Sequence, residues 1–175
     1  MMIRNFFFKK KLFILGLIIA LLIAFLDLYS KNLVFCFLDK ISANSPLQHS
    51  EFVITRFFNL VKVRNNGVSF GMLSGLACGK YIILSINLGI LLALLIWLYR
   101  NKIAYLTFAI ALIIGGAIGN IVDRVWNNAV ADFLDFHLFG YHWPAFNLAD
   151  SAVFLGVVLL LLENYFVKPN KNKYV

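Results

Sequence analysis

The sequence predicts an all-α membrane protein with four transmembrane helices, and two observations carry this prediction. Hydrophobic residues make up 62% of the 175 residues and charged residues only 14%, whereas soluble globular chains have roughly 45–50% and 25%. The hydrophobic residues also gather in four stretches, each close to the roughly 20 residues that a helix needs to cross a bilayer. This composition excludes a water-soluble monomer and a disordered chain. Two cysteines are too few for a secreted disulfide scaffold.

The predicted spans cover residues 12–30, 81–99, 103–122 and 145–166. The first is interrupted only by Asp27, the second and third contain no charge, and the fourth carries Asp150 near its start and Glu163 near its end. Basic residues precede the first span, as in a secretory signal peptide, but no small-x-small cleavage site follows it. The first span is therefore predicted to be a retained helix, and four spans place both termini on one side.

The distribution of Lys and Arg predicts which side that is. Nine of the 16 Lys and Arg residues lie in the two short tails and in the turn after residue 99. The other seven are spread thinly over the two long segments 31–80 and 123–144. Because short cytoplasmic segments carry the excess of positive charge, the termini are predicted to be cytoplasmic. The net charge of +8 thus reports topology and attraction to anionic lipid, and it does not indicate a nucleic-acid partner.

The two long segments are predicted to face away from the cytoplasm. Alternation of apolar and polar residues in 51–73 favours short strands around a turn at Asn65-Asn66-Gly67. Segment 123–144 is rich in aromatic residues, as expected of a membrane-interface belt. These are Trp126, Phe133, Phe136, Phe139, Tyr141 and Trp143. No internal repeat is visible, so a single domain covering residues 1–175 is predicted.

Acidic residues gather at one depth of the predicted bundle. Asp27, Asp123, Asp132, Asp135 and Asp150 all fall at or near the non-cytoplasmic ends of the spans. Ionisable groups in a span are costly, so each needs a reason. For three of them a structural interpretation is the simplest: Asp27 forms an ion pair with Lys31 at a helix end, Asp123 supports the structure beside Arg124, and Asp135 faces water.

Other chemistries find little support in the sequence. The histidines show no metal-binding spacing, no serine or cysteine has the context of a nucleophile, and Cys36 and Cys78 are expected to be buried hydrophobic residues. Asp132 and Asp150 remain without evident cationic partners. Facing each other, two carboxylates share a proton at neutral pH and can hydrolyse an amide. A proton-coupled transporter could use the same pair, and these residues alone leave both alternatives open.

Five motifs in one chain carry a resemblance to a known family. They are Asp27-x-x-x-Lys31, VRNNGVSFG at 63–71, GAIGNIVDR at 116–124, VADF at 130–133 and FNLADS at 146–151. In this order and on this side of the membrane, they resemble the bacterial lipoprotein signal peptidases (signal peptidase II), which are aspartic endopeptidases. The resemblance extends over residues 12–166.

The resemblance implies roles for individual residues. It makes Asp132 and Asp150 the catalytic pair. It places four polar residues around the site, Asn65, Asn120, Arg124 and Asn147, and it makes Asp27 and Asp123 supporting acids. No metal or organic cofactor is implied.

The resemblance also implies a fold, a substrate and a location. The expected fold has four transmembrane helices, a small periplasmic β-cradle and a short periplasmic helix over the site. The expected substrate is a prolipoprotein whose cysteine already carries diacylglycerol, cut on the amino side of that cysteine. The expected protein is a monomer in contact with lipid in the bacterial inner membrane, with the active site near the periplasmic face.

Overall fold

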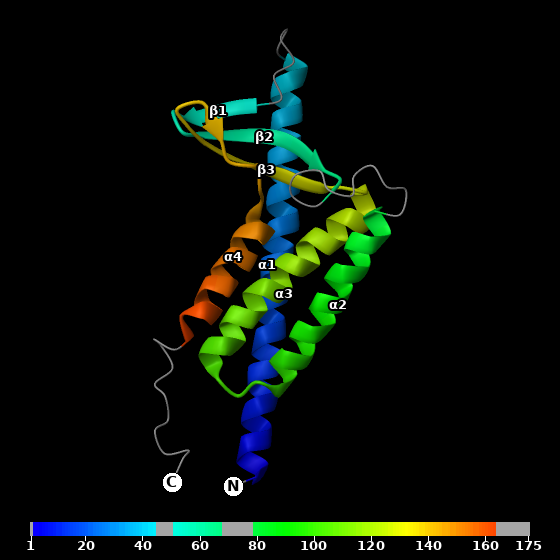
Figure 1. Ribbon diagram of the computed structural model, residues 1–175, viewed down its shortest axis with the longest axis vertical. Helices are drawn as coiled ribbons and strands as arrows, with labels where there is room; N and C mark the ends of the chain where they lie inside the picture. Colours follow the sequence, from blue (N-terminus) through cyan, green and yellow to red (C-terminus); the bar gives the residue numbers. More distant parts are fainter. Residues whose placement is uncertain (1, 45–50, 68–78, 164–175) are drawn as a thin grey trace.

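Four helices and a small antiparallel sheet make up the computed structural model, which describes residues 2–44, 51–67 and 79–163. The helices are α1 (Met2–Asn44), α2 (Gly79–Arg100), α3 (Ala104–Asn127) and α4 (Leu148–Leu161). The strands are β1 (Glu51–Thr55), β2 (Phe58–Asn65), β3 (Val130–Leu138) and β4 (Tyr141–His142). Figure 1 shows the sheet at one end of the helical bundle, while the start of α1 and the turn between α2 and α3 lie at the other end.

The predicted spans correspond to helices, with a correction at the first of them. Helices α2 and α3 match the predicted spans 81–99 and 103–122 closely. Together with α1 they are long and apolar enough to cross a membrane, whereas α4, with 14 residues, is shorter. The described residues therefore contain three helices of spanning length and a shorter apolar helix, α4, within the predicted span 145–166, and residues 164–166 lie outside the described part.

Helix α1 does not end at residue 30 as predicted but continues to Asn44. The expected break was Lys31, because a charge at the end of an apolar run usually marks the bilayer surface. Instead Lys31 is buried among acids, and the helix beyond it has its own apolar face. Val34, Phe35 and Leu38 on this face pack against Ala131 and Phe133 of β3. Burial of these side chains holds the extension as helix.

Helix α3 is the centre of the bundle. In its most apolar stretch 67% of the residues are buried, against 28% in α1 and 11% in α2. Close approach to α4 requires a glycine at position 116, since a Cβ there would collide with the carbonyl oxygen of Ala149. Small residues allow this kind of contact where lipid offers no hydrophobic drive between helices. The start of α4 is thereby fixed against the outer half of α3.

The four strands form one sheet in the order β1-β2-β3-β4, with every neighbouring pair antiparallel. The β1–β2 hairpin turn lies at Arg56-Phe57. At the predicted turn Asn65-Asn66-Gly67, β2 ends and Gly67 N donates to Asn65 Oδ1 at 3.1 Å, and the residues after it, 68–78, lie outside the described part of the chain. Strand β2 pairs with β3, which the sequence presented as an aromatic loop, and Asn65 lies opposite Val130.

Two further expectations concern the segments 31–80 and 123–144, which were predicted to face the periplasm. Among the described residues, no separate short helix lies between α1 and α4 apart from α2 and α3, and residues 68–78 lie outside them. The aromatic residues of 123–144 differ in exposure. Phe133 is buried, while Trp126, Phe139, Tyr141 and Trp143 are largely exposed.

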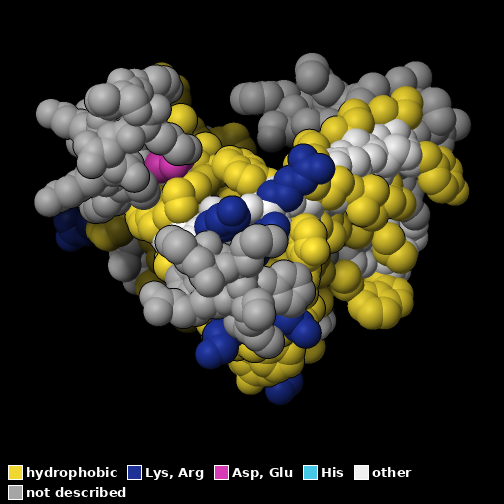
Figure 2. Space-filling view, turned by 90° about the horizontal axis from the view of Figure 1, so that it is seen from below, with side chains coloured by type: hydrophobic (Ala, Val, Ile, Leu, Met, Phe, Trp, Pro, Cys, Tyr) yellow, Lys and Arg dark blue, Asp and Glu magenta, His cyan; other side chains and the backbone are white. Residues whose placement is uncertain are grey.

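The bundle end opposite the sheet carries basic side chains. Figure 2 shows Lys and Arg side chains over a mostly hydrophobic surface at this end. Arg100 and Lys102 of the α2–α3 turn are exposed, and Lys9 lies over the ring of Tyr99, 4.8 Å from its centre. The basic residues that the sequence places in short segments thus lie together at one end of the folded molecule.

Candidate active site

Asp132 lies in strand β3, at the point where the sheet meets the helices. Its side chain is 2% exposed and accepts hydrogen bonds from two amides. Asn147 Nδ2 donates to Asp132 Oδ1 at 2.7 Å, and Asn65 Nδ2 donates to Asp132 Oδ2 at 3.1 Å. Asn65 lies in β2, so the pairing of β2 with β3 brings it to Asp132 across 67 residues of sequence.

The start of α4 holds Asp150 through a capping box. Asn147 is the N-cap residue: its Oδ1 accepts from Asp150 N at 3.0 Å, and Asp150 Oδ2 accepts from Asn147 N at 3.3 Å. An acid in the first turn also interacts favourably with the helix dipole. Because the cap uses only Oδ1 of Asn147, its Nδ2 group remains available to Asp132. One asparagine therefore contacts both acids.

Asn120 of α3 joins the pair to the buried interior. Its Nδ2 donates to Asp150 Oδ1 at 2.8 Å. Its Oδ1 accepts from Asn147 Nδ2 at 3.2 Å and from Lys31 Nζ at 3.0 Å. Each amide group thus has a defined orientation, since the carbonyl side faces the ammonium and the amino side faces the carboxylate.

Lys31 anchors a buried ionic cluster beneath the two acids. Its Nζ lies 2.7 Å from Asp27 Oδ2 and 3.1 Å from Asp123 Oδ2, and all three residues are at most 3% exposed. The predicted pairing of Asp27 with Lys31 is confirmed, although it lies in the middle of α1 and not at a helix end. Lys31 was missed as a site residue. The available signal was its spacing of four from Asp27.

The supporting acids also fix the backbone of the elements that carry the pair. Asp27 Oδ1 accepts from Ala149 N at 2.8 Å, next to Asp150. Asp123 Oδ2 accepts from Ala131 N at 3.0 Å, next to Asp132. Each acid therefore positions the residue that precedes one member of the pair. Asp27 requires Gly119 in α3, where a Cβ would collide with its carboxylate.

Arg124 faces a cavity of about 390 Å³ beside the acids. Asn120 and Asp150 line the same cavity, and the other walls are mainly apolar side chains of α2, α3 and α4, among them Ile83, Ile86 and Ile113. Arg124 Nε is buried and has no hydrogen-bond partner within the described part of the chain. A guanidinium with an unused donor at the edge of an apolar cavity is suited to hold a carbonyl oxygen.

The surroundings of Asp132 raise the pKa of its carboxyl group. Burial, and next the negative charge of Asp150, raise the pKa of Asp132 from 3.8 to about 6, against the opposing effect of the amides of Asn65 and Asn147. A carboxyl group with this pKa exchanges its proton near neutral pH, as acid–base catalysis requires.

Asp135 does not face water, contrary to the expectation. It is 5% exposed, accepts from Asn59 Nδ2 at 3.2 Å and lies 2.9 Å from His142 Nδ1. Asp135 follows Asp132 by three positions in β3, an odd number, so the two side chains leave opposite faces of the strand. Cys36 is likewise exposed, where a buried side chain was expected, and Cys78 lies outside the described residues.

Comparison with known proteins identifies this arrangement. A family model described as "Signal peptidase (SPase) II" matches residues 19–166, which include every residue of the site. The chain belongs to the signal peptidase II family. It is therefore a membrane peptidase, and the aspartic mechanism is consistent with the family.

Individual relatives agree with the family assignment. A lipoprotein signal peptidase from Francisella tularensis subsp. novicida is 41% identical over 167 residues, covering 91% of this chain and 94% of the relative. The lipoprotein signal peptidase of Cupriavidus pinatubonensis is 49% identical over 113 residues, covering 63% and 64%. A solved structure of a bacterial membrane enzyme has 30% identity and a TM-score of 0.70, covering 91% and 93%.

The raised pKa of Asp132 predicts a pH-dependent stability difference. Because the folded state holds this proton more tightly than the unfolded chain, the wild type loses stability as the pH rises from 3.8 through about 6. Asp132→Asn removes the ionisation. A shift of this size corresponds to at most about 3 kcal/mol. We expect the variant to unfold several degrees above the wild type at pH 8, with the difference vanishing near pH 4.

Thermal unfolding in detergent at a series of pH values measures this effect. Asp39→Asn is the control, since Asp39 is paired with Lys62 at the surface. A difference between Asp132→Asn and wild type that stays constant across this pH range would contradict the assignment.

Proposed function

We propose that this peptidase removes the signal peptide from prolipoproteins, with Asp132 and Asp150 as the catalytic pair. The observation that carries the proposal is Asn147, which donates to Asp132 and caps Asp150, while Asp150 itself lines a mainly apolar cavity. Two carboxylates held by one amide, beside a compartment suited to lipid, fit amide hydrolysis on a membrane-bound substrate. A transporter would be expected to place such acids at the middle of the bilayer in broken helices.

The geometry supports a water-mediated cleavage. The ionised carboxylate of the pair takes a proton from water as the water oxygen attacks the scissile carbonyl carbon. The protonated carboxyl group donates its proton to the leaving nitrogen as the carbon–nitrogen bond breaks. The Arg124 guanidinium would stabilise the negative charge that develops on the carbonyl oxygen. Asn65, Asn120 and Asn147 keep the two acids in place throughout.

The cavity next to Arg124 supports a lipid-modified substrate. Its apolar walls from three helices would accept the acyl chains of a diacylglyceryl cysteine while the peptide reaches Asp150. Cleavage on the amino side of that cysteine would leave the lipid on the mature protein. We propose that the modified cysteine lies at the outer end of this cavity.

The lipid should therefore determine the cleavage rate. Each buried methylene contributes roughly 0.8 kcal/mol, so a precursor without its diacylglyceryl group should be processed at least about a hundredfold more slowly. Purified protein is incubated with lipidated and unlipidated forms of one precursor, and cleavage is followed by the mobility shift on a gel. Asp132→Asn serves as the blank for both. Equal rates for the two forms would indicate a general peptidase and refute the proposed substrate.

We propose further that the protein is a monomer in the inner membrane with both termini in the cytoplasm and the sheet on the periplasmic side. The support is the charge distribution: exposed Lys10, Lys11, Arg100 and Lys102 lie at the end opposite the sheet. This orientation places Asp132 and Asp150 near the periplasmic surface, where a lipidated precursor would be anchored.

Cysteine labelling tests the orientation. On a background without Cys36 and Cys78, a cysteine replaces either Phe139, 91% exposed at the tip of the sheet, or Lys102 in the α2–α3 turn. In intact spheroplasts an impermeant maleimide should label only the variant at position 139, and after lysis it should label both. Labelling of position 102 alone in intact spheroplasts would invert the topology.

A further inference from the structure

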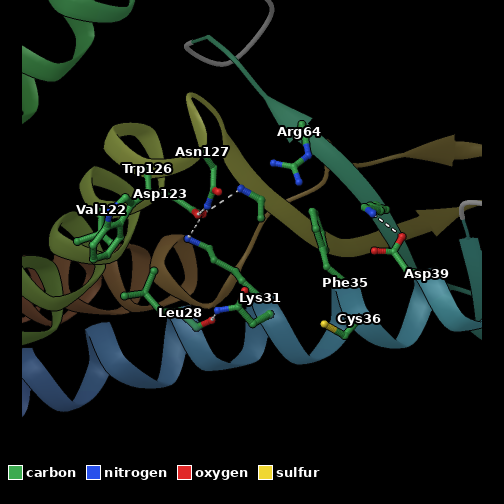
Figure 3. Close-up of a pocket in the computed structure, with 13 residues that line it drawn as sticks. Leu28, Lys31, Phe35, Cys36, Asp39, Arg64, Val122, Asp123, Trp126 and Asn127 are labelled. Atoms are coloured by element: carbon green, nitrogen blue, oxygen red, sulfur yellow. Dashed lines mark hydrogen bonds and ion pairs between the residues drawn. The ribbon is translucent and has the colours of Figure 1, made fainter.

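A second cavity, of about 300 Å³, lies between α1, β2 and the end of α3. Figure 3 shows this space, with Arg64 of β2 on one side and Lys31 and Phe35 of α1 on the other. Ala131 of β3 lines it, whereas the next residue, Asp132, points to the catalytic asparagines. Neighbouring residues of a strand face opposite sides, so β3 separates the cavity from the catalytic pair.

The acids that line this cavity are already paired. Asp123 Oδ1 accepts from Asn127 at 2.9 Å, and its Oδ2 accepts from Ala131 N and contacts Lys31. Asp39 forms an ion pair with Lys62. Because both acids already have partners, the cavity is not suited to binding a cation.

Two cations converge on one ring at its wall. Lys62 and Arg64 are two residues apart in β2 and therefore share one face of the strand. Both lie over Phe35, with Lys62 Nζ 5.4 Å and Arg64 Cζ 5.8 Å from the ring centre. Among the described residues, no acid or other hydrogen-bond acceptor is recorded for the Arg64 guanidinium. Of these two cations, Lys62 is already neutralised by its ion pair with Asp39. The uncompensated charge of the cavity is thus positive and belongs to Arg64.

An apolar stripe on α1 leads directly to the cavity. Ile18, Leu22, Phe25 and Tyr29 are all more than half exposed and follow each other at spacings of four, three and four, so they lie in line on one helix face. The next positions in that line are Asn32 and Cys36, and both line the cavity. In a bilayer this stripe contacts acyl chains.

We propose that this cavity binds the phosphate headgroup of a membrane phospholipid. Arg64 donates to the phosphate oxygens through its planar fork, and the acyl chains lie along the stripe from Tyr29 to Ile18. Trp126, which lines the cavity and is 77% exposed, is typical of the level of the headgroups. The bound lipid is separate from the substrate and lies on the other side of β3.

Protection of Cys36 measures the binding, because Cys36 lines the cavity and is exposed. With Cys78 replaced by serine, the rate of alkylation by N-ethylmaleimide is measured in neutral detergent micelles. Dioleoylphosphatidylglycerol, dioleoylglycerol and inorganic phosphate are added in separate titrations. We expect only the phospholipid to slow alkylation substantially.

Two arginines of the same hairpin provide the matched comparison. Arg56 lies in the β1–β2 turn, exposed and outside the cavity lining. Arg64→Gln should require at least about tenfold more phospholipid for half-protection, since it loses charge-assisted hydrogen bonds, while Arg56→Gln should match the wild type. Arg64→Lys, which keeps the charge but not the fork, should fall between them. This intermediate value also separates loss of binding from loss of folding.

Three results would overturn the proposal. Equal protection by dioleoylglycerol would mean that apolar shielding of Cys36 needs no phosphate. Equal protection by inorganic phosphate at the same concentration would assign the cavity to a free anion and not to a lipid. Equal half-protection of Arg64→Gln and Arg56→Gln would remove Arg64 as the ligand.

Discussion

Replacing either Asp132 or Asp150 with asparagine should lower the cleavage rate by about three to four orders of magnitude. Asparagine keeps the size of the side chain and much of the hydrogen bonding to Asn147 and Asn120. It cannot take a proton from water or supply one to the leaving nitrogen. The double variant should be little slower than either single variant, since residues that act as one unit are not additive.

Asp135→Asn is the matched control for this experiment. Asp135 is also a buried carboxylate of β3, but it contacts Asn59 and His142 and not the catalytic pair. The substitution should reduce heat stability while leaving the rate per folded molecule within about threefold of the wild type, as expected for a group that touches no reacting atom. Rates are measured with lipidated precursor at matched amounts of folded protein. Substantial cleavage by folded Asp132→Asn or Asp150→Asn would refute the aspartic mechanism.

Lys31→Met should destabilise the protein by about 3–5 kcal/mol, because it leaves buried acids without their counter-charge. Asp27 and Asp123 both contact the ammonium and are almost completely buried. Asn120 Oδ1 also loses one of its two donors, so the amide that holds Asp150 is less firmly oriented. We expect a sharp fall in the yield of folded protein, measured by size-exclusion chromatography and thermal unfolding.

Two further variants make this result specific. Lys62→Met removes a lysine whose ion pair with Asp39 is partly exposed to solvent, and such pairs contribute less than about 1 kcal/mol. Adding Asp27→Asn to Lys31→Met removes one of the two uncompensated charges and should recover part of the lost stability. If Lys31→Met and Lys62→Met were equally mild, the buried cluster would not support the fold as described.

The features that the sequence predicted correctly depend on short stretches of chain. Helices α2 and α3 follow from uncharged runs of spanning length, because the apolar solvent requires every backbone group to be satisfied within the helix. The capping box of Asn147 and Asp150 spans only four residues. The prediction of a carboxylate pair rested on two acids without nearby cations, and the family resemblance then named the surrounding asparagines.

The errors have a common cause in contacts between distant segments. Lys31 looked like the end of a span, but Asp123 and Asn120, about 90 residues away, compensate its charge, so α1 continues and supports the sheet. Asp135 looked solvated, but Asn59 and His142 bury it from a neighbouring strand and a hairpin.

The sequence by itself determined the membrane class and two helices of spanning length, α2 and α3, since these depend on hydropathy. The assignment of Asp132 and Asp150 as the pair is a prediction that came from the family resemblance. Only the tertiary structure decided which charges are buried. An ion can be buried when oppositely charged or hydrogen-bonding side chains of other elements contact it. Strand pairing and helix packing decide whether those side chains are close enough. The same reason explains why the cation pair over Phe35 is visible only in three dimensions: Phe35 and Arg64 meet because β2 crosses the extension of α1.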